Sequence, residues 1–272
     1  MSLITLTSGI GCGAIDIAQL LGEKLGLEVY DDERLQEEAV AMGISSDELK
    51  SLDEKVPGLF NRLLRMKPDT YREVMEALIY QVSGNDRAII LGHGAPFLLR
   101  DFGCALHVRI YSSESFRIDT LVNEQELTPD AARKVIQKSD NDRKGFMQFT
   151  FNMDWDDPSL YDVIINRDKL GTEGVIELII AATDTESIST CSLGALETME
   201  RMSLAKQVEA TIIKNFIHPE HFHVEVPETG VVYLTGMINP LESKDKLINV
   251  IRAVPGVREV KGQLTSEKIH DI

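Results

Sequence analysis

The stretch spanning residues 4–18 constrains this chain most, because an apolar strand runs there into a glycine-rich turn and then into an amphipathic helix. Apolar residues at helical spacing, among them Ile17, Leu20 and Leu21, predict that helix over Ile15–Lys24. In such a turn, backbone N–H groups and the helix N-terminus converge on one anion. The sequence therefore predicts a phosphate cradle at the start of an α/β fold.

The cradle lacks the cation that usually accompanies it. The full phosphate-binding signature places a lysine and then a serine or threonine directly after the last glycine, whereas Ala14, Ile15 and Asp16 stand there in this chain. Two interpretations stay open: the turn binds an anion through its backbone alone, or its glycines serve only the close packing of strand and helix. For the first, the expected nucleotide-binding residues are Ser8, Gly9, Gly11, Cys12 and Gly13.

Short apolar strands alternate with helical patterns through residue 182. The strands are expected at Leu3–Thr7, Leu27–Tyr30, Arg87–Leu91, Leu106–Tyr111 and Val163–Asn166. The helices are expected at Ile15–Lys24, Asp32–Ala41, Asp69–Val82, Ser113–Val122, Pro129–Lys138 and Thr172–Ala182. This alternation favours a parallel sheet with helices on both faces. All strands but the second are expected to be direct neighbours, with the glycine-rich turn at the carboxyl edge of the sheet.

A second, smaller module follows a linker. Residues 183–194 are polar, rich in Ser and Thr and without periodicity, which is typical of a linker. Helical spacing from Met199 to Ile212 and strand alternation from Phe222 to Val226 then open an α-β-β-α-β pattern that extends to residue 268. The sequence thus predicts a first domain over residues 1–182 and an α+β domain over residues 195–268.

Charge is distributed unevenly along the chain. The net charge is −16, and residues 1–190 carry 33 acidic and 19 basic side chains, against 11 and 9 from Cys191 onward. An acidic domain does not attract nucleic acid, and it favours a small phosphorylated ligand only where its arginines gather at one site. The second module has no basic cluster that would bind anionic membranes strongly.

Other features bear on location and metals. The chain has no apolar run of the roughly 18–20 residues that a membrane span requires, and its start does not resemble a signal peptide. Its three cysteines lack metal or disulfide spacing, so a cytoplasmic location is expected. The histidines at positions 218, 221 and 223 have no evident fourth ligand, and no protein-bound metal is expected.

Several motifs resemble the cytidylate kinase-like family, which is related to the bacterial nucleoside monophosphate kinases. These motifs are Gly11–Gly13, Leu27–Asp32, Ala88–Ala95, Ser112–Ile118, Lys138–Arg143 and, most specific, Asp154–Asp162 followed by Asn166. The resemblance covers about residues 1–182. It implies a P-loop sheet, a mobile lid, and phosphoryl transfer from ATP to a nucleotide with Mg²⁺. The C-terminal module resembles a BON domain through residues 230–236 and 254–260, and BON modules are associated with lipid or partner contacts.

The resemblance also implies roles for individual residues. Arg117 and Arg143 keep basic positions of the family pattern and are the expected catalytic residues. The expected substrate-binding residues are Asp31, Asp32, His93 and Arg100. His93 stands where the family has an arginine that holds a substrate phosphate. Each of these substrate-binding residues also has a structural alternative. His93 could be a buried structural histidine, and one of the two aspartates could cap the next helix. Arg100 could pair with the neighbouring Asp101.

These observations favour binding of a nucleotide or another small phosphorylated ligand, with weak or no phosphoryl transfer and a sensing or regulatory role. The alternative within the family is an active ATP-dependent nucleoside monophosphate kinase that recruits Arg117, Arg143 and His93, with ATP and Mg²⁺ as cofactors. A third hypothesis is a non-enzymatic interaction protein. The BON-like module is expected to contact a protein partner or a second copy of the chain.

Overall fold

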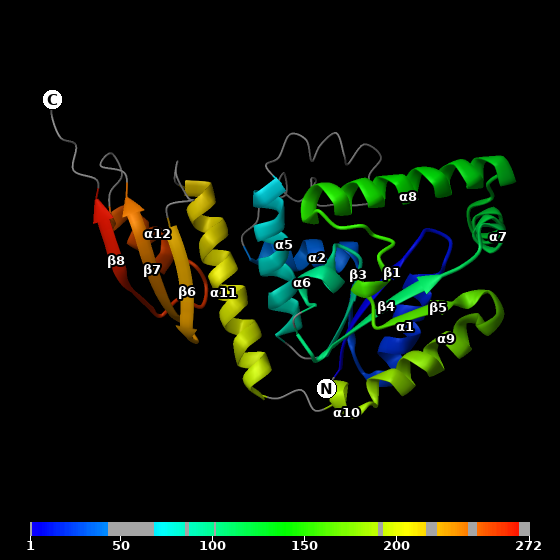
Figure 1. The fold of residues 1–272 in the computed structure, drawn as a ribbon, viewed down its shortest axis with the longest axis horizontal. Helices are drawn as coiled ribbons and strands as arrows, with labels where there is room; N and C mark the ends of the chain where they lie inside the picture. Colours follow the sequence, from blue (N-terminus) through cyan, green and yellow to red (C-terminus); the bar gives the residue numbers. More distant parts are fainter. Residues whose placement is uncertain are drawn as a thin grey trace. The chain divides into compact units, whose positions relative to one another are not determined.

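The computed structural model describes residues 2–42, 68–84, 87–100, 102–189, 193–215, 222–238 and 244–266, which form two compact units. The first unit contains a five-stranded sheet, drawn with its helices in Figure 1. Its strands are β1 (Ser2–Ser8), β2 (Glu28–Tyr30), β3 (Arg87–Leu91), β4 (Ala105–Tyr111) and β5 (Val163–Asn166). They lie in the order β2-β3-β1-β4-β5, and every neighbouring pair is parallel. The predicted fold class and the predicted neighbours are confirmed.

Helices cover both faces of this sheet. On one face, α1 (Ala14–Leu25) and α9 (Arg167–Thr183) bury an apolar cluster that includes Ile4 and Leu6 of β1. Thr5 and Thr7 alternate with these residues and therefore point to the opposite face. There, Thr7 lines a small cavity together with residues of α6 (Ala95–Leu98) and α8 (Pro129–Phe151). The remaining helical segments of this unit are α2 (Asp32–Ala41), α7 (Glu114–Gln125), η1 (Pro158–Leu160) and α10 (Glu186–Ser189).

Helices α7 and α8 form a hairpin beside the glycine-rich turn. Their own apolar cluster contains Ile118, Leu121 and Ile136, and Ile10 of the turn packs against it. The sequence pattern ended α8 at Lys138, but the helix continues to Phe151. Its second half is polar from residue 138 to residue 145, and the helix is anchored beyond this stretch by Phe146 and Phe151, which are buried and in edge-to-face contact. Packing against distant residues thus extends the helix where local periodicity fades.

The second unit has the predicted α-β-β-α-β order. Its elements are α11 (Leu193–Asn215), β6 (Phe222–Glu228), β7 (Val231–Ile238), α12 (Lys244–Arg252) and β8 (Glu259–Ser266). Strand β7 lies between β6, with which it is antiparallel, and β8, with which it is parallel. Val208, Leu234 and Ile251 belong to the core of this unit, which α11, the sheet and α12 build together.

One helix that was predicted in the first domain groups with the second unit. Residues 69–84, which carry α5 (Pro68–Ser83), group by their contacts with the second unit. Ser203 of α11 donates to the carbonyl oxygen of Ala77 at 3.2 Å, and Lys206 pairs with Glu76 at 2.9 Å. The first unit is therefore discontinuous in sequence, although the domain boundaries themselves stay a prediction.

The cysteines depart from the expectation based on their spacing. Cys12 is free and buried, and burial raises the pKa of its thiol. Cys104, however, is disulfide-bonded. The cytoplasmic location stays a prediction. Within the described residues, the helices are all too short or too polar to cross a bilayer.

Candidate functional site

The glycine-rich turn occupies the place that the sequence predicted, between the end of β1 and the start of α1. Gly11 and Gly13 have φ values of 80° and 66°, a backbone conformation that residues with a Cβ rarely adopt. Gly13 is also the N-cap of α1, and no side chain caps the helix there. The first N–H groups of α1 thus remain available to an anion, as the cradle hypothesis requires.

Three arginines from three helices surround this turn and bind its carbonyl oxygens. Arg143 of α8 donates to Ser8 at 2.6 Å, Nε of Arg117 of α7 donates to Ile10 at 2.7 Å, and Arg167 of α9 donates to Cys12 at 2.7 Å. The arginines that the charge argument required do therefore gather at one site. Arg167 was missed in the sequence, where the available signal was a lone arginine directly after the last strand of the sheet.

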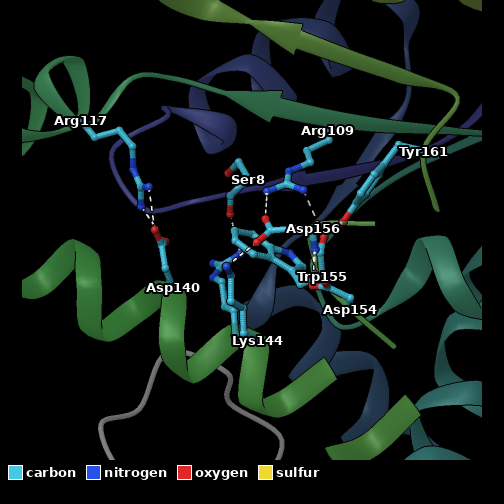
Figure 2. Close-up of polar contacts among 10 residues, drawn as sticks. Ser8, Arg109, Arg117, Asp140, Lys144, Asp154, Trp155, Asp156 and Tyr161 are labelled. Atoms are coloured by element: carbon cyan, nitrogen blue, oxygen red, sulfur yellow. Dashed lines mark hydrogen bonds and ion pairs between the residues drawn. The ribbon is translucent and has the colours of Figure 1, made fainter. Parts of the chain in front are cut away.

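Arg117 is also paired with an acid, as Figure 2 shows. Its two Nη atoms donate to the two carboxylate oxygens of Asp140 at 2.8 and 2.7 Å, a bidentate arrangement. Burial lowers the pKa of Arg117, but the hydrogen bonds and charge of Asp140 outweigh burial and the net shift is upward. Arg117 is thus fully charged, and Asp140 neutralises much of its field.

A cleft of about 580 Å³ opens over the turn. Its basic wall residues are Lys138 and Arg143, both on α8. Its acidic wall residues are Asp16, Asp31, Asp32, Glu124 and Asp142. Neither Arg117 nor Arg167 is among the described residues that line the cleft. Of the two expected catalytic residues, the structure therefore brings Arg143 to the cleft and turns Arg117 toward the back of the loop. Their roles in a reaction stay a prediction.

The predicted pair of aspartates divides into two roles. Asp31 is the N-cap of α2 and accepts from the N–H of Arg34 at 3.0 Å. Asp32 lies 2.8 Å from Nε2 of His93. His93 is 4% exposed and has a φ of 55°, at the carboxyl end of β3. This histidine is thus held by a neighbouring carboxylate at the edge of the sheet, and the assignment of both aspartates to a substrate remains a proposal.

The Asp154–Asp162 motif, the most specific part of the family resemblance, lies beside Arg143. Arg109 of β4 donates to Asp156 at 2.5 Å and lies 4.6 Å from the centre of the Trp155 ring. Tyr161 donates to the carbonyl oxygen of Trp155 at 3.0 Å, and burial is the main cause that raises the pKa of Tyr161 to about 12. The guanidinium of Arg143 lies 6.0 Å from the same tryptophan ring. Figure 2 shows Ser8 near the cluster of Arg109, Trp155, Asp156 and Tyr161.

The last predicted substrate residue lies apart from the cleft. Arg100 lies 5.2 Å from the centre of the Phe97 ring and does not line the cleft among the described residues. Its sequence neighbour Asp101, the alternative partner, falls outside the described residues. So do His218 and His221, whereas His223 is exposed and contacts Glu225 at 3.1 Å. In the described ranges, no three His, Cys, Asp or Glu side chains are placed to hold a metal ion.

Comparisons with known proteins bear on the family and the fold of this chain. Curated relatives named cytidylate kinase include proteins from Thermoplasma volcanium, 23% identical over 68% of this chain and 92% of the relative, and from Methanococcus aeolicus, 26% identical over 68% and 99%. A crystal structure of an uncharacterized protein from Eubacterium ventriosum shares the fold, with a TM-score of 0.52 and 20% identity over 67% of this chain and 98% of that one. The BON domain model matches residues 203–268. The model of the cytidylate kinase-like family matches residues 3–169, more than half of the chain, and the chain therefore belongs to that family.

Proposed function

We propose that the first unit binds a nucleotide or another small phosphorylated ligand in the cleft over the glycine-rich turn, with weak or no phosphoryl transfer. The volume of about 580 Å³ suits a small-molecule ligand. The relatives named cytidylate kinase make a nucleotide the first choice. A protein that binds such a ligand without efficient turnover would serve in sensing or regulation.

The balance of charge around the turn carries this proposal. Phosphoryl transfer relies on cations that neutralise the transferred oxygens. Here the signature lysine is Ala14, and Asp16 lies in the first turn of α1 and lines the cleft. Arg117, a buried cation that contacts the loop, is paired with Asp140. Removing one such electrostatic donor commonly costs about 3–4 kcal/mol of transition-state stabilisation. The cradle can hold an anion, but it is poorly equipped to stabilise further negative charge.

If the ligand is ATP, the residues present define where it would bind. The loop N–H groups, Arg143 and Lys138 would contact its phosphates. Asp16 stands where the parent signature has the hydroxyl that binds Mg²⁺, and carboxylate oxygens are ligands that Mg²⁺ accepts. A bound Mg²⁺ would neutralise phosphate charge beside the acidic wall of the cleft.

A second candidate function is an active nucleoside monophosphate kinase. The observation in its favour is that Lys138 and Arg143 both face the cleft from α8, where they could replace the missing loop lysine. The two candidates differ in turnover. We expect turnover of ATP with any nucleoside monophosphate at least about a thousandfold below the roughly 1–100 per second of typical kinases.

Calorimetric titration of ATP, CMP and a bisubstrate analogue, with and without Mg²⁺, tests the proposal together with steady-state turnover. Binding without turnover supports it, and turnover within tenfold of ordinary kinases supports the active kinase instead. The Lys138→Met variant should weaken ATP binding about tenfold, the value of one charge-assisted contact. The matched control is Lys134→Met, one helical turn away and outside the cleft lining. Absence of any binding would leave the interaction-protein hypothesis.

For the second unit, we propose contact with a protein partner or a second copy of the chain. This proposal is supported by the match to the BON domain and by the nearly balanced charge of this region, with 11 acidic and 9 basic side chains from Cys191 onward.

A further inference from the structure

The three arginines contact the glycine-rich turn in a regular pattern. They bind the carbonyl oxygens of Ser8, Ile10 and Cys12, and each of these residues directly precedes a glycine. Every bonded carbonyl therefore shares its peptide group with a glycine N–H, at positions 9, 11 and 13. Within the described residues, the N–H groups of Gly11 and Gly13 donate to no other group. Gly9 directly follows the ladder between β1 and β4, which ends at the pair Ser8 and Ile110.

Each of these peptide groups connects an arginine, bound at its carbonyl oxygen, with the N–H group on its other side. The peptide bonds here are all trans, so each N–H points away from the C=O of its own peptide and thus away from the arginine. A cation that binds a carbonyl oxygen draws electron density toward it and makes the N–H of that peptide a stronger donor. Hydrogen bonds linked in this way strengthen one another by about 10–30% per bond in condensed phase.

We propose that Arg167 is a positioning residue that polarises the anion cradle from behind, through its peptide groups, and that Arg117, whose field Asp140 largely neutralises, does so more weakly. This inference rests on the proposed function, and it names the ligand group as a phosphate or pyrophosphate held by the glycine N–H groups. It explains how the cradle works without the signature lysine: the positive charge lies on the outer side of the loop, where it touches carbonyl oxygens instead of the ligand.

Arg167 carries this inference furthest, because no acid neutralises it in the described part of the chain. Its second Nη atom donates to the hydroxyl of Thr172 at 2.9 Å, and its guanidinium lies 5.4 Å from the centre of the Phe116 ring. Its guanidinium also fills the space that a Cβ at Gly13 would need. Thus Gly13 is required both for its positive φ and for the close approach of Arg167.

Two unique dipeptides make the effect measurable by NMR in the full chain. Cys-Gly occurs once in the sequence, at positions 12–13, and Ile-Gly occurs once, at positions 10–11. Labelling cysteine or isoleucine at the carbonyl carbon and glycine at nitrogen therefore isolates the amide signal of Gly13 or Gly11. In the Arg167→Met variant, the Gly13 amide proton should shift upfield while the Gly11 signal stays in place. The Arg133→Met control, an exposed arginine on α8, should move neither signal.

Calorimetry with pyrophosphate supplies the functional readout. Arg167→Met should weaken binding about tenfold, in line with the loss of one hydrogen bond to a charged group. Arg167→Lys, which restores a charged donor, should recover most of the affinity. An unmoved Gly13 signal, or an affinity equal to that of Arg133→Met, overturns the inference. Failure of the wild-type chain to bind either pyrophosphate or ATP would instead refute the proposed function.

Discussion

The ion pair between Arg117 and Asp140 is expected to hold the α7–α8 hairpin onto the glycine-rich turn, and a double-mutant cycle can measure its strength. The Arg117→Met change removes the bidentate pair and also the 2.7 Å hydrogen bond to Ile10. The Asp140→Asn change keeps the shape of the side chain and one acceptor oxygen but removes its charge. The double variant completes the cycle and isolates the interaction between the two side chains.

The magnitude follows from the burial of the two partners. Their side chains are 11% and 25% exposed. Exposed pairs contribute about 0–1 kcal/mol, whereas breaking a buried pair costs about 3–5 kcal/mol. For this intermediate case with bidentate geometry we expect a coupling energy of about 2 kcal/mol. Arg117→Met alone should cost about 3 kcal/mol, since it also loses the hydrogen bond to the loop carbonyl.

Urea unfolding followed by tryptophan fluorescence is the suitable assay. Trp155 is the only tryptophan of the chain, it is buried, and it belongs to the first unit. Its signal therefore reports the unfolding of the unit that contains the ion pair. The matched control is the pair of Arg133 and Glu114, which joins the same two helices with side chains 50% and 56% exposed.

The control pair should show a coupling energy below about 0.5 kcal/mol. A coupling for Arg117 and Asp140 that is no larger than that of the control would refute the reasoning. It would show that the apolar contact of Ile10 with α7 and α8, rather than the ion pair, holds the hairpin in place.

Two further predictions concern pH and membranes. Burial lowers the pKa of His107 from its usual 6.5. Below about pH 6.5 the unfolded chain therefore binds more protons than the folded chain, and stability should fall as the pH falls. The urea midpoint measured between pH 7.5 and 5.5 tests this, and the same dependence of the midpoint on pH in the His107→Gln variant would contradict it. The full chain should stay in the supernatant when sedimented with anionic lipid vesicles at physiological salt, since the region from Cys191 onward lacks a basic cluster. Robust pelleting would show that the membrane interpretation is right.

Local patterns were sufficient to predict the architecture. Strand and helix alternation, with fully apolar strands, predicted the parallel sheet and its neighbours, because a strand buried on both faces must be apolar along its whole length. The turn at Gly9–Gly13 was located correctly as well, since only glycine readily adopts the positive φ found at Gly11 and Gly13. Both signals depend only on residues close together in the sequence, so they can be read without the tertiary structure.

The charge around the turn was decided by the tertiary structure. Arg117, Arg143 and Arg167 are separated by 26 and 24 positions in the sequence and lie on three helices, yet their guanidinium groups meet at one loop. Sequence spacing could not show that Asp140 takes the charge of one of them, that Arg167 joins the group, or that residues 69–84 pack with the second unit. Hydrogen bonds and ion pairs act over a few ångströms in space, and the distance in space between residues far apart in the chain is fixed only when the fold closes.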